Sequence, residues 1–209
     1  MRTIAEIFRS YAVFDGEGRH TNGTDKQSNH SYGDAYEQLL YRSNFVTVNT
    51  EMGPLPVNQP YSIRDEIKLM MEVGVADGSC LLAWREVFPN ATIVGMDVHP
   101  SDKAHGDRIE FHLGDQRSRQ DCERAAGGRQ FDLIIEDAVH SLENTLLTLY
   151  WLWPFVRPGG MYVVEEWDGT DRDRIRALFP MAEVIGTCGP HVADEPLVVF
   201  RKPMGGKLC

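Results

Sequence analysis

Residues 69–100 read LMMEVGVADGSCLLAWREVFPNATIVGMDVHP. An apolar run opens the stretch, a glycine-containing turn follows, and an apolar-periodic segment over 78–88 predicts a helix. A second apolar run over 91–98 predicts another strand that ends in an acidic residue. Gly74 and Gly78 let the turn adopt positive φ and let a ligand approach the backbone closely. The stretch therefore predicts a strand–turn–helix–strand unit with a ligand at the turn.

Outside this unit, strands and helices keep alternating. The predicted strands cover 68–75, 91–98, 109–115, 131–137, 161–167, 182–189 and 195–202. The predicted helices cover 78–88, 119–127, 141–156 and 171–180, with a turn at 157–160. This alternation is typical of an α/β fold: a Rossmann-like, seven-stranded, mostly parallel sheet with helices on both faces. The last two strands are close enough in sequence to form a C-terminal antiparallel hairpin.

The N-terminal region is more polar and less regular. We expect an arm or lid with short helices over residues 1–62, followed by the core domain over 63–209. Within the arm, the sequence predicts helices at 4–14 and 31–42 and loops at 15–30 and 50–62.

The composition of the chain narrows the classes of function that it can have. A formal net charge of −10 over 209 residues argues against a nucleic-acid partner, which normally requires a basic face. The four cysteines form no CxxC pair, so a zinc site is not expected. No apolar run is long enough for a membrane span, and the N-terminus lacks the apolar core of a signal peptide. These features favour a cytoplasmic protein with free thiols.

The acidic residues at the predicted strand ends indicate the ligand. The turn is neither GxGxxG nor a phosphate loop, and Asp77 within it would repel a pyrophosphate and attract an ammonium group. Asp97 ends the second strand, the position from which a carboxylate binds ribose hydroxyls. A ligand with a ribose, a positive charge and no phosphate fits S-adenosylmethionine better than a dinucleotide. The alternative is an ordinary glycine-rich turn of a Rossmann-like sheet.

Several stretches together resemble the class I S-adenosylmethionine-dependent methyltransferases, and within them the macrocin- and mycinamicin-type sugar O-methyltransferases and the cephalosporin-hydroxylase-like proteins. The stretches are GTDKQSNHSYGDAYEQLL, EVGVADGSCLLAWREVFPNATIVGMDV, FHLGDQ, FDLIIEDAVHS and LWPFVRPGGMYVVEEW, within residues 23–167. The family usually has Asp-Asp-Gly-Ser-His where this chain has Glu-Asp-Ala-Val-His at 136–140. The Asp-x-x-His spacing is kept, but the loop between these residues differs.

The resemblance implies a role for each residue of the cofactor site. The cofactor set is Glu72, Gly74, Ala76, Asp77 and Ser79 for the methionine part, Asp97 for the ribose, Asp115 and Gln116 for the adenine, and Asp137. For Asp115 the alternative is a helix N-cap or turn residue.

Catalysis and metal binding are expected at the ends of two later strands. Asp137 and His140 are the predicted catalytic residues, with His140 as the base that takes the proton from an attacking hydroxyl. Carboxylates that converge repel one another unless a cation lies among them, so we expect Mg²⁺ or another divalent ion there. The candidate ligands are Asp137, Glu165, Glu166 and Glu136. Which acid of each adjacent pair points inward stays open, because strand neighbours face opposite ways. The alternative is surface acids and a histidine that caps the next helix.

Residues 24–36, TDKQSNHSYGDAY, resemble the family segment that folds over the cofactor and shapes the acceptor site. It contains Asp25, Lys26, His30 and two tyrosines; the alternative is an exposed arm.

The resulting hypothesis is an S-adenosylmethionine-dependent O-methyltransferase with divalent metal assistance. Its acceptor is expected to be a hydroxyl of a small molecule, such as a sugar of a natural product in antibiotic biosynthesis. Loops 14–35 and 50–62, or a partner subunit of a homo-oligomer, are expected to complete the acceptor pocket. The alternatives are an NAD-dependent oxidoreductase on a similar sheet and a non-catalytic cofactor-binding relic.

Overall fold

The computed structural model describes residues 2–17, 20–27, 30–50, 53–166, 176–186 and 196–205. Within these ranges, no side chain is described for residues 20, 43–46, 48–49 and 55–60.

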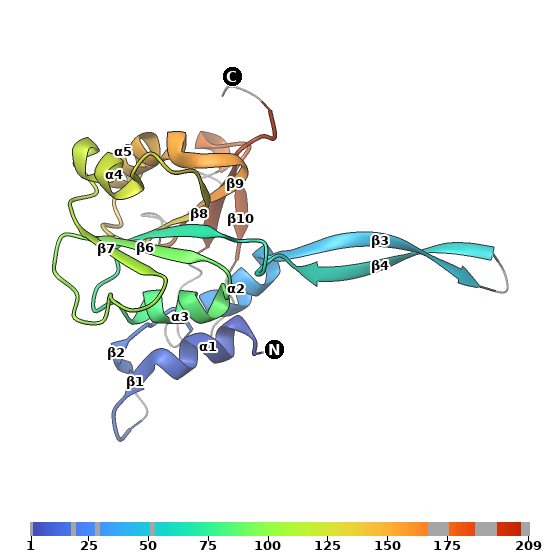
Figure 1. Ribbon diagram of the computed structural model, residues 1–209, viewed down its shortest axis with the longest axis horizontal. Helices are drawn as coiled ribbons and strands as arrows, with labels where there is room; N and C mark the ends of the chain where they lie inside the picture. The colour runs from blue at the N-terminus through green and yellow to red at the C-terminus, as the bar shows by residue number, and fades with distance from the viewer. Residues whose placement is uncertain are drawn as a thin grey trace.

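A seven-stranded sheet forms the centre of the molecule (Figure 1). Its strand order is β10-β11-β9-β8-β5-β6-β7. The strands are β5 (Leu69–Val73), β6 (Thr92–Asp97), β7 (Ile109–Leu113), β8 (Phe131–Glu136), β9 (Val156–Val164), β10 (Glu183–Ile185) and β11 (Leu197–Arg201). The strands β5 to β9 run parallel to one another, whereas β11 pairs antiparallel with both β9 and β10. The predicted mostly parallel sheet and its C-terminal antiparallel pair are confirmed.

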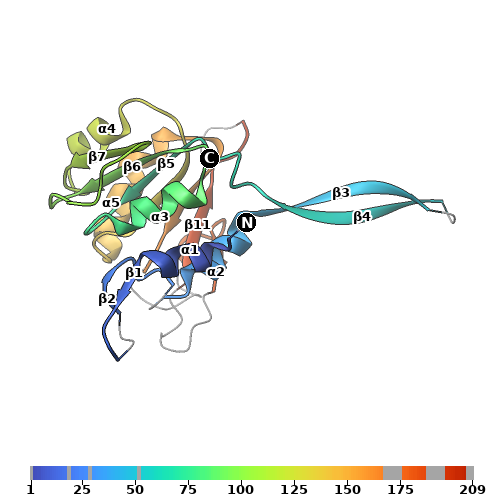
Figure 2. The same ribbon diagram turned by 60° about the horizontal axis from the view of Figure 1, so that its bottom comes forward.

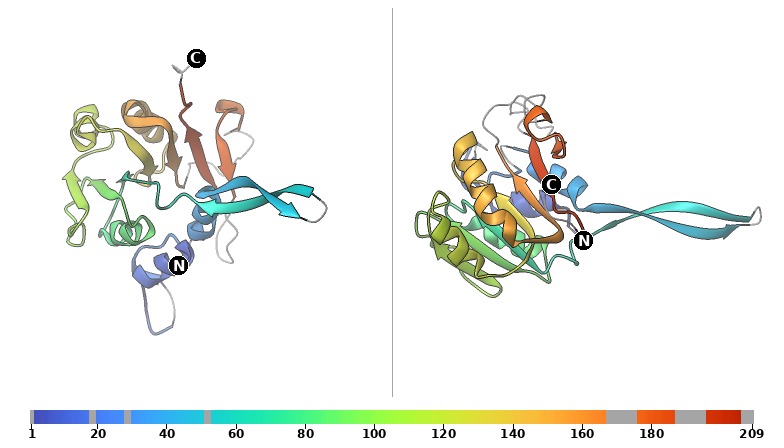
Figure 3. Two further views of the ribbon diagram at one scale, coloured as in Figure 1. Left: turned by 45° about the vertical axis from the view of Figure 1, so that its right-hand side comes forward. Right: turned by 90° about the horizontal axis from the view of Figure 1, so that it is seen from above.

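Helices cover both faces of the sheet (Figures 1 and 3). The helices are α1 (Ile4–Tyr11), α2 (Tyr32–Leu39), α3 (Ser79–Val87), α4 (Arg119–Ala126) and α5 (Leu142–Leu152), the last followed by the 3₁₀ turn η1 (Trp153–Phe155). Helices α1, α2 and α3 share one buried hydrophobic cluster, and the second cluster contains residues of α4 and α5. All six residues of β8 are buried, as expected for a parallel strand covered on both faces.

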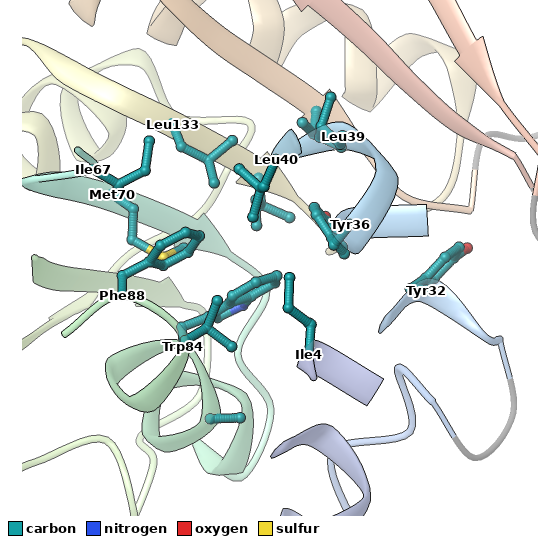
Figure 4. Close-up of a cluster of buried hydrophobic side chains, with 14 of the residues drawn as sticks. Ile4, Tyr32, Tyr36, Leu39, Leu40, Ile67, Met70, Trp84, Phe88 and Leu133 are labelled. Carbon is teal, nitrogen blue, oxygen red and sulfur yellow. The ribbon is translucent and has the colours of Figure 1, made fainter. Parts of the chain in front are cut away.

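The first cluster joins the N-terminal helices to the core (Figure 4). The Trp84 ring lies edge-on to Phe8 and Tyr36, with ring centroids 4.8 Å apart in each pair. These residues come from α3, α1 and α2, so the N-terminal helices pack into the same core as the sheet. The division of the chain at residue 62 stays a prediction.

Residues 41–50 and 53–62 form a long two-stranded ribbon, whereas a loop was predicted at 50–62. The strands β3 (Tyr41–Thr50) and β4 (Gly53–Ser62) pair from Tyr41↔Ser62 to Thr50↔Gly53 and project from the body (Figures 1 and 2). The prolines that suggested a loop occupy positions 54, 56 and 60 of β4. In a strand, every second residue directs its backbone nitrogen to the same edge. The three prolines all have even numbers, so all three fit the unpaired outer edge of a two-stranded ribbon.

Smaller differences concern the other turns. The predicted loop at 15–30 contains β2 (His20–Gly23), which pairs with β1 (Ala12–Phe14), and the predicted turn at 157–160 lies within β9. There the pairing with β8 shifts register between Phe131 and Leu133, so an irregular strand replaces a separate turn. Of the predicted helix at 171–180, residues 171–175 lie outside the described residues, and 176–178 are helical. Among the described helices, none combines the length and apolar character that a membrane crossing requires.

Candidate functional site

A cavity of about 570 Å³ opens at the carboxyl ends of the central strands. Strand β5 lies between β6 and β8, so the strand order reverses there, and this is where sheets of this kind bind ligands. The lining residues come from four regions of the chain: residues 23–26 with His30, the β5–α3 turn, the ends of β6 and β7, and the segments after β8 and β9. The sequence-based expectation of a ligand site at this edge agrees with the position of the cavity.

The β5–α3 turn has the conformation that its glycines predict. Gly74 and Gly78 both have φ +86°, and Ala76 has φ +45°, which is uncommon for a residue with a side chain. A Cβ on Gly74 would lie 2.0 Å from the backbone oxygen of Asp137, so only glycine allows the β5 and β8 ends to approach this closely. Of the five residues predicted for the methionine part, Gly74, Ala76 and Asp77 line the cavity, whereas Glu72 and Ser79 do not.

Asp97 holds this turn in place. Its Oδ2 accepts hydrogen bonds from the backbone N–H groups of Val75 (2.9 Å) and Ala76 (3.0 Å), and its Oδ1 accepts from His99 N (2.9 Å). A carboxylate has about four acceptor positions, so one remains for a ligand in the cavity. The predicted contact with ribose hydroxyls stays a prediction, and the structure adds a second role in shaping the turn.

Asp77 and Ser79 form a polar group at the cavity rim. Lys103 Nζ lies 2.7 Å from Asp77 Oδ2 and donates to Ser79 Oγ at 3.0 Å. Ser79 also donates from its backbone N–H to Asp77 Oδ1. The predicted attraction of Asp77 for an ammonium group is therefore opposed by a lysine that already pairs with it.

The two residues expected at the adenine differ in their surroundings. Asp115 lines the cavity and forms an ion pair with Arg117 at 2.7 Å, and its Oδ1 also accepts from Arg117 N. This geometry agrees with the turn alternative as well as with a cofactor role. Gln116 is buried, donates to Glu136 and Thr148, and accepts from Val139 N, so its amide group is used within the protein.

Strand alternation decides which acids face each other. Glu72 and Glu165 lie on the sheet face covered by α1–α3, while Glu136 lies on the face covered by α4 and α5. Glu136 is buried beside Gln116 and belongs to neither group of residues that could hold a metal. Burial raises the pKa of Glu136 to about 7, partly offset by hydrogen bonds from Thr145 and Gln116. The structure therefore does not bring Glu136 to the predicted metal site.

The carboxylates of Glu72, Asp137 and Glu165 form an inner group that surrounds Lys26. Its Nζ lies 2.6 Å from Glu165 Oε2, 2.7 Å from Asp137 Oδ2 and 3.1 Å from Glu72 Oε1. Burial alone would lower the pKa of Lys26, but Asp137, Glu165 and Glu72 outweigh it and hold the pKa well above its ordinary value. Tyr36 donates to the other oxygen of Glu165 at 2.6 Å. Lys26 is thus a protonated cation at the centre of predicted site residues.

An outer group faces the cavity. Asp137, His140 and Glu166 offer ligand atoms within 4.8 Å of one another, and all three line the cavity. His140 Nε2 lies 3.2 Å from Glu166 Oε2, and His30 Nε2 lies 3.1 Å from Glu166 Oε1. Two carboxylates at this spacing fit a divalent cation that completes its shell with water or substrate oxygens, and the imidazole beside them can either join the ligands or stay free as a base. Of the predicted ligands, this group contains Asp137 and Glu166.

The contacts of two site residues were not predicted. Lys26 and His30 were expected only as members of a segment over the cofactor, whereas they contact site acids directly. Their separation in sequence from these acids, 139 residues for Lys26 and Glu165, leaves no periodic signal for the contact. The alternative in which His140 caps α5 is not supported, because the N-cap is Ser141 and no side chain caps it.

A comparison with solved structures identifies the fold. A putative ribosomal RNA methyltransferase from Plasmodium falciparum superimposes with a TM-score of 0.53 at 19% sequence identity, covering 66% of this chain and 88% of that chain. No family model matches the chain. With the strand order, this likeness shows a Rossmann-like fold of the kind that this methyltransferase has.

Curated relatives narrow the resemblance. The chain is 33% identical over 112 residues to demethylmacrocin O-methyltransferase of Streptomyces fradiae. This matched region covers 49% of this chain and 28% of that protein. The chain is 34% identical over 113 residues to mycinamicin VI 2''-O-methyltransferase of Micromonospora griseorubida, with the same 49% and 28% coverage. The predicted resemblance to the macrocin- and mycinamicin-type sugar O-methyltransferases is confirmed. The matched region spans under a third of the length of these relatives.

Proposed function

We propose that the protein is an S-adenosylmethionine-dependent O-methyltransferase that acts on a hydroxyl group of a small molecule with assistance from a divalent cation. The observation that carries this proposal is the cavity that joins two features. One side is the β5–α3 turn held by Asp97, and the other side is the group of Asp137, His140 and Glu166. A cofactor at the first feature and an acceptor at the second would share one cavity.

The residues of the cavity fit the proposed cofactor. The Gly74 and Gly78 conformations allow close backbone approach, and Asp97 keeps an acceptor position that suits a ribose hydroxyl. The cofactor supplies an activated methyl group. The protein's contribution is to bind and orient the two reactants, which can account for a large share of a rate enhancement.

His140 is the proposed base. Glu166 lies 3.2 Å from its Nε2, so the carboxylate can orient the imidazole and stabilise it when it carries a proton, as a carboxylate does in other acid–base pairs. Asp137 and Glu166 are the proposed oxygen ligands of the cation, which would lower the pKa of a bound hydroxyl. His140 would then take the proton of that hydroxyl.

The proposed acceptor is a sugar hydroxyl of a natural product. The sequence relatives support this class, because their names place them on sugar-bearing macrolide substrates. Residues 23–26 and His30 line the cavity, in agreement with the expected contribution of loop 14–35. Among the side chains of β4 that the structure describes, those at 54, 61 and 62 do not line the cavity, and the expected contribution of 50–62 stays a prediction.

The experiment is a transfer assay with S-adenosylmethionine labelled in its methyl group, Mg²⁺ and a panel of glycosylated polyketides. We expect label in at least one glycoside and none in its aglycone. Label in the aglycone alone would contradict the sugar assignment. Binding of S-adenosylhomocysteine without transfer to any member of a broad panel would favour a cofactor-binding relic.

A further inference from the structure

Lys26 is buried among acids to an extent that is unusual for a lysine. Its relative exposure is 1%, and lysine is almost never buried to this extent unless it is paired. The three acids around it come from the ends of β5, β8 and β9, while Lys26 itself comes from the segment between β2 and α2. A single cation thus connects the N-terminal region to three strands of the sheet.

The same three acids have the geometry of a metal site. Glu72, Asp137 and Glu165 each offer an oxygen within 4.8 Å of the others, which is the spacing of carboxylates around one ion. Glu72 Oε2 is buried and makes no hydrogen bond within the described part of the chain. The Lys26 ammonium lies within 3.1 Å of an oxygen of each acid and therefore occupies the space that such an ion would need.

Asp137 belongs to both the inner and the outer group. Lys26 engages its Oδ2, which leaves Oδ1 for a ligand in the cavity. Without the ammonium, three carboxylates would face one another in a buried space, an arrangement that is unfavourable unless protons or another cation compensate.

We propose that Lys26 is a built-in cation that takes the place of a metal ion among Glu72, Asp137 and Glu165. It is a positioning residue: it fixes the Asp137 carboxylate at the cavity wall and restricts added divalent cations to the outer group of Asp137, His140 and Glu166. The second part rests on the proposed function, because it assumes that the outer group binds a cation.

The test is a count of bound Mn²⁺ by electron paramagnetic resonance on EDTA-treated protein. Lys26→Met removes the charge and keeps most of the side-chain volume, so we expect it to bind one more Mn²⁺ than the wild-type protein. The double variant Lys26→Met, Glu165→Gln should lose this additional site, because one of its three acids is neutral. Lys103→Met is the matched control: it removes an ammonium from Asp77, an acid that lines the cavity, at a position where the lysine is partly exposed, and should add no site.

The outcomes separate this inference from the proposed function. If the wild-type protein binds no Mn²⁺ and Lys26→Met binds one ion, the replacement of a metal ion by Lys26 holds, whereas the restriction of cations to the outer group and the metal part of the proposed function both fail. If folded Lys26→Met binds the same number of ions as the wild-type protein, the inference on Lys26 is overturned. Should Lys26→Met not fold alone, Mn²⁺ is expected to restore its refolding, and refolding unaffected by Mn²⁺ would overturn the inference equally.

Discussion

His140 Nε2 lies 3.2 Å from Oε2 of Glu166, across the cavity end of β9. The histidine follows β8 and the glutamate follows β9, so two neighbouring parallel strands bring them together. Glu166 has φ +47°, and its backbone N–H donates to the Tyr32 hydroxyl. The sheet edge and the N-terminal region thus hold this pair jointly.

The first prediction concerns His140. If His140 removes the proton of the acceptor hydroxyl, His140→Ala should lower kcat by about 10²- to 10⁴-fold, the usual contribution of a general base. Affinity for S-adenosylhomocysteine, measured by calorimetry, should change little, because the base acts on the acceptor. His105→Ala is the control, since that histidine is exposed and outside the cavity lining. An unchanged kcat in His140→Ala would remove the residue from the proposed role.

Glu166 gives a separate prediction. Glu166→Gln keeps the shape of the side chain but removes the charge that orients His140 and that is proposed to bind the cation. We expect both a lower kcat and a higher Mg²⁺ concentration for half-maximal activity. Glu143→Gln, an exposed acid of α5, serves as the control for charge removal. A Glu166→Gln enzyme with the same Mg²⁺ dependence as the wild-type enzyme would argue against Glu166 as a ligand.

The Asp97 contacts predict a loss of cofactor binding. Asp97→Ala removes the acceptor for the Val75 and Ala76 N–H groups, and a hydrogen bond to a charged group contributes about 1.5–3 kcal/mol. Affinity for S-adenosylhomocysteine should fall by about tenfold or more. Asp97→Asn retains one acceptor oxygen and should fall less, while Asp107→Ala, an exposed aspartate, should leave affinity unchanged. Equal affinities for Asp97→Ala and the wild-type protein would show that this turn does not hold the cofactor.

Glu136 predicts a specific pH dependence of stability. Its pKa is raised from 4.5 to about 7, so between these values the folded protein binds more protons than the unfolded chain. The free energy of unfolding should therefore fall as pH rises through this window, by up to about 1.4 kcal/mol per pH unit from this residue. Glu136→Gln cannot ionise and should gain stability relative to the wild-type protein over the same window.

The measurement is urea unfolding in EDTA at several pH values from about 4 to about 8. The stability difference between Glu136→Gln and the wild-type protein should be constant at the acid end and shift towards the variant as pH rises. Glu143→Gln should follow the wild-type pH profile. Parallel profiles for Glu136→Gln and the wild-type protein would contradict the raised pKa.

Comparison of sequence and structure shows which features were predictable. The strands β5, β6 and β8 and the positions of Asp77 and Asp97 followed from apolar runs that end in acidic residues, because burial on both faces leaves little choice of sequence. The hairpin β3–β4 was missed because prolines usually indicate loops, and only the pairing register shows that they share one edge.

The candidate site was predictable only in part for a similar reason. The acids were identified from their positions after strands, but the facing of Glu72 and Glu165 depends on the register of the sheet, and the contact with Lys26 depends on tertiary packing. The pattern of residues within one segment reveals neither the register of the sheet nor the contact with Lys26.

The central claim is that the cavity at the ends of β5, β6 and β8 binds S-adenosylmethionine. Calorimetric titration of the purified protein with S-adenosylhomocysteine and, separately, with NAD tests it most directly. We predict one S-adenosylhomocysteine bound per chain, a weaker signal in Asp97→Ala, and no heat with NAD. Heat with NAD and none with S-adenosylhomocysteine would contradict the account and favour an oxidoreductase.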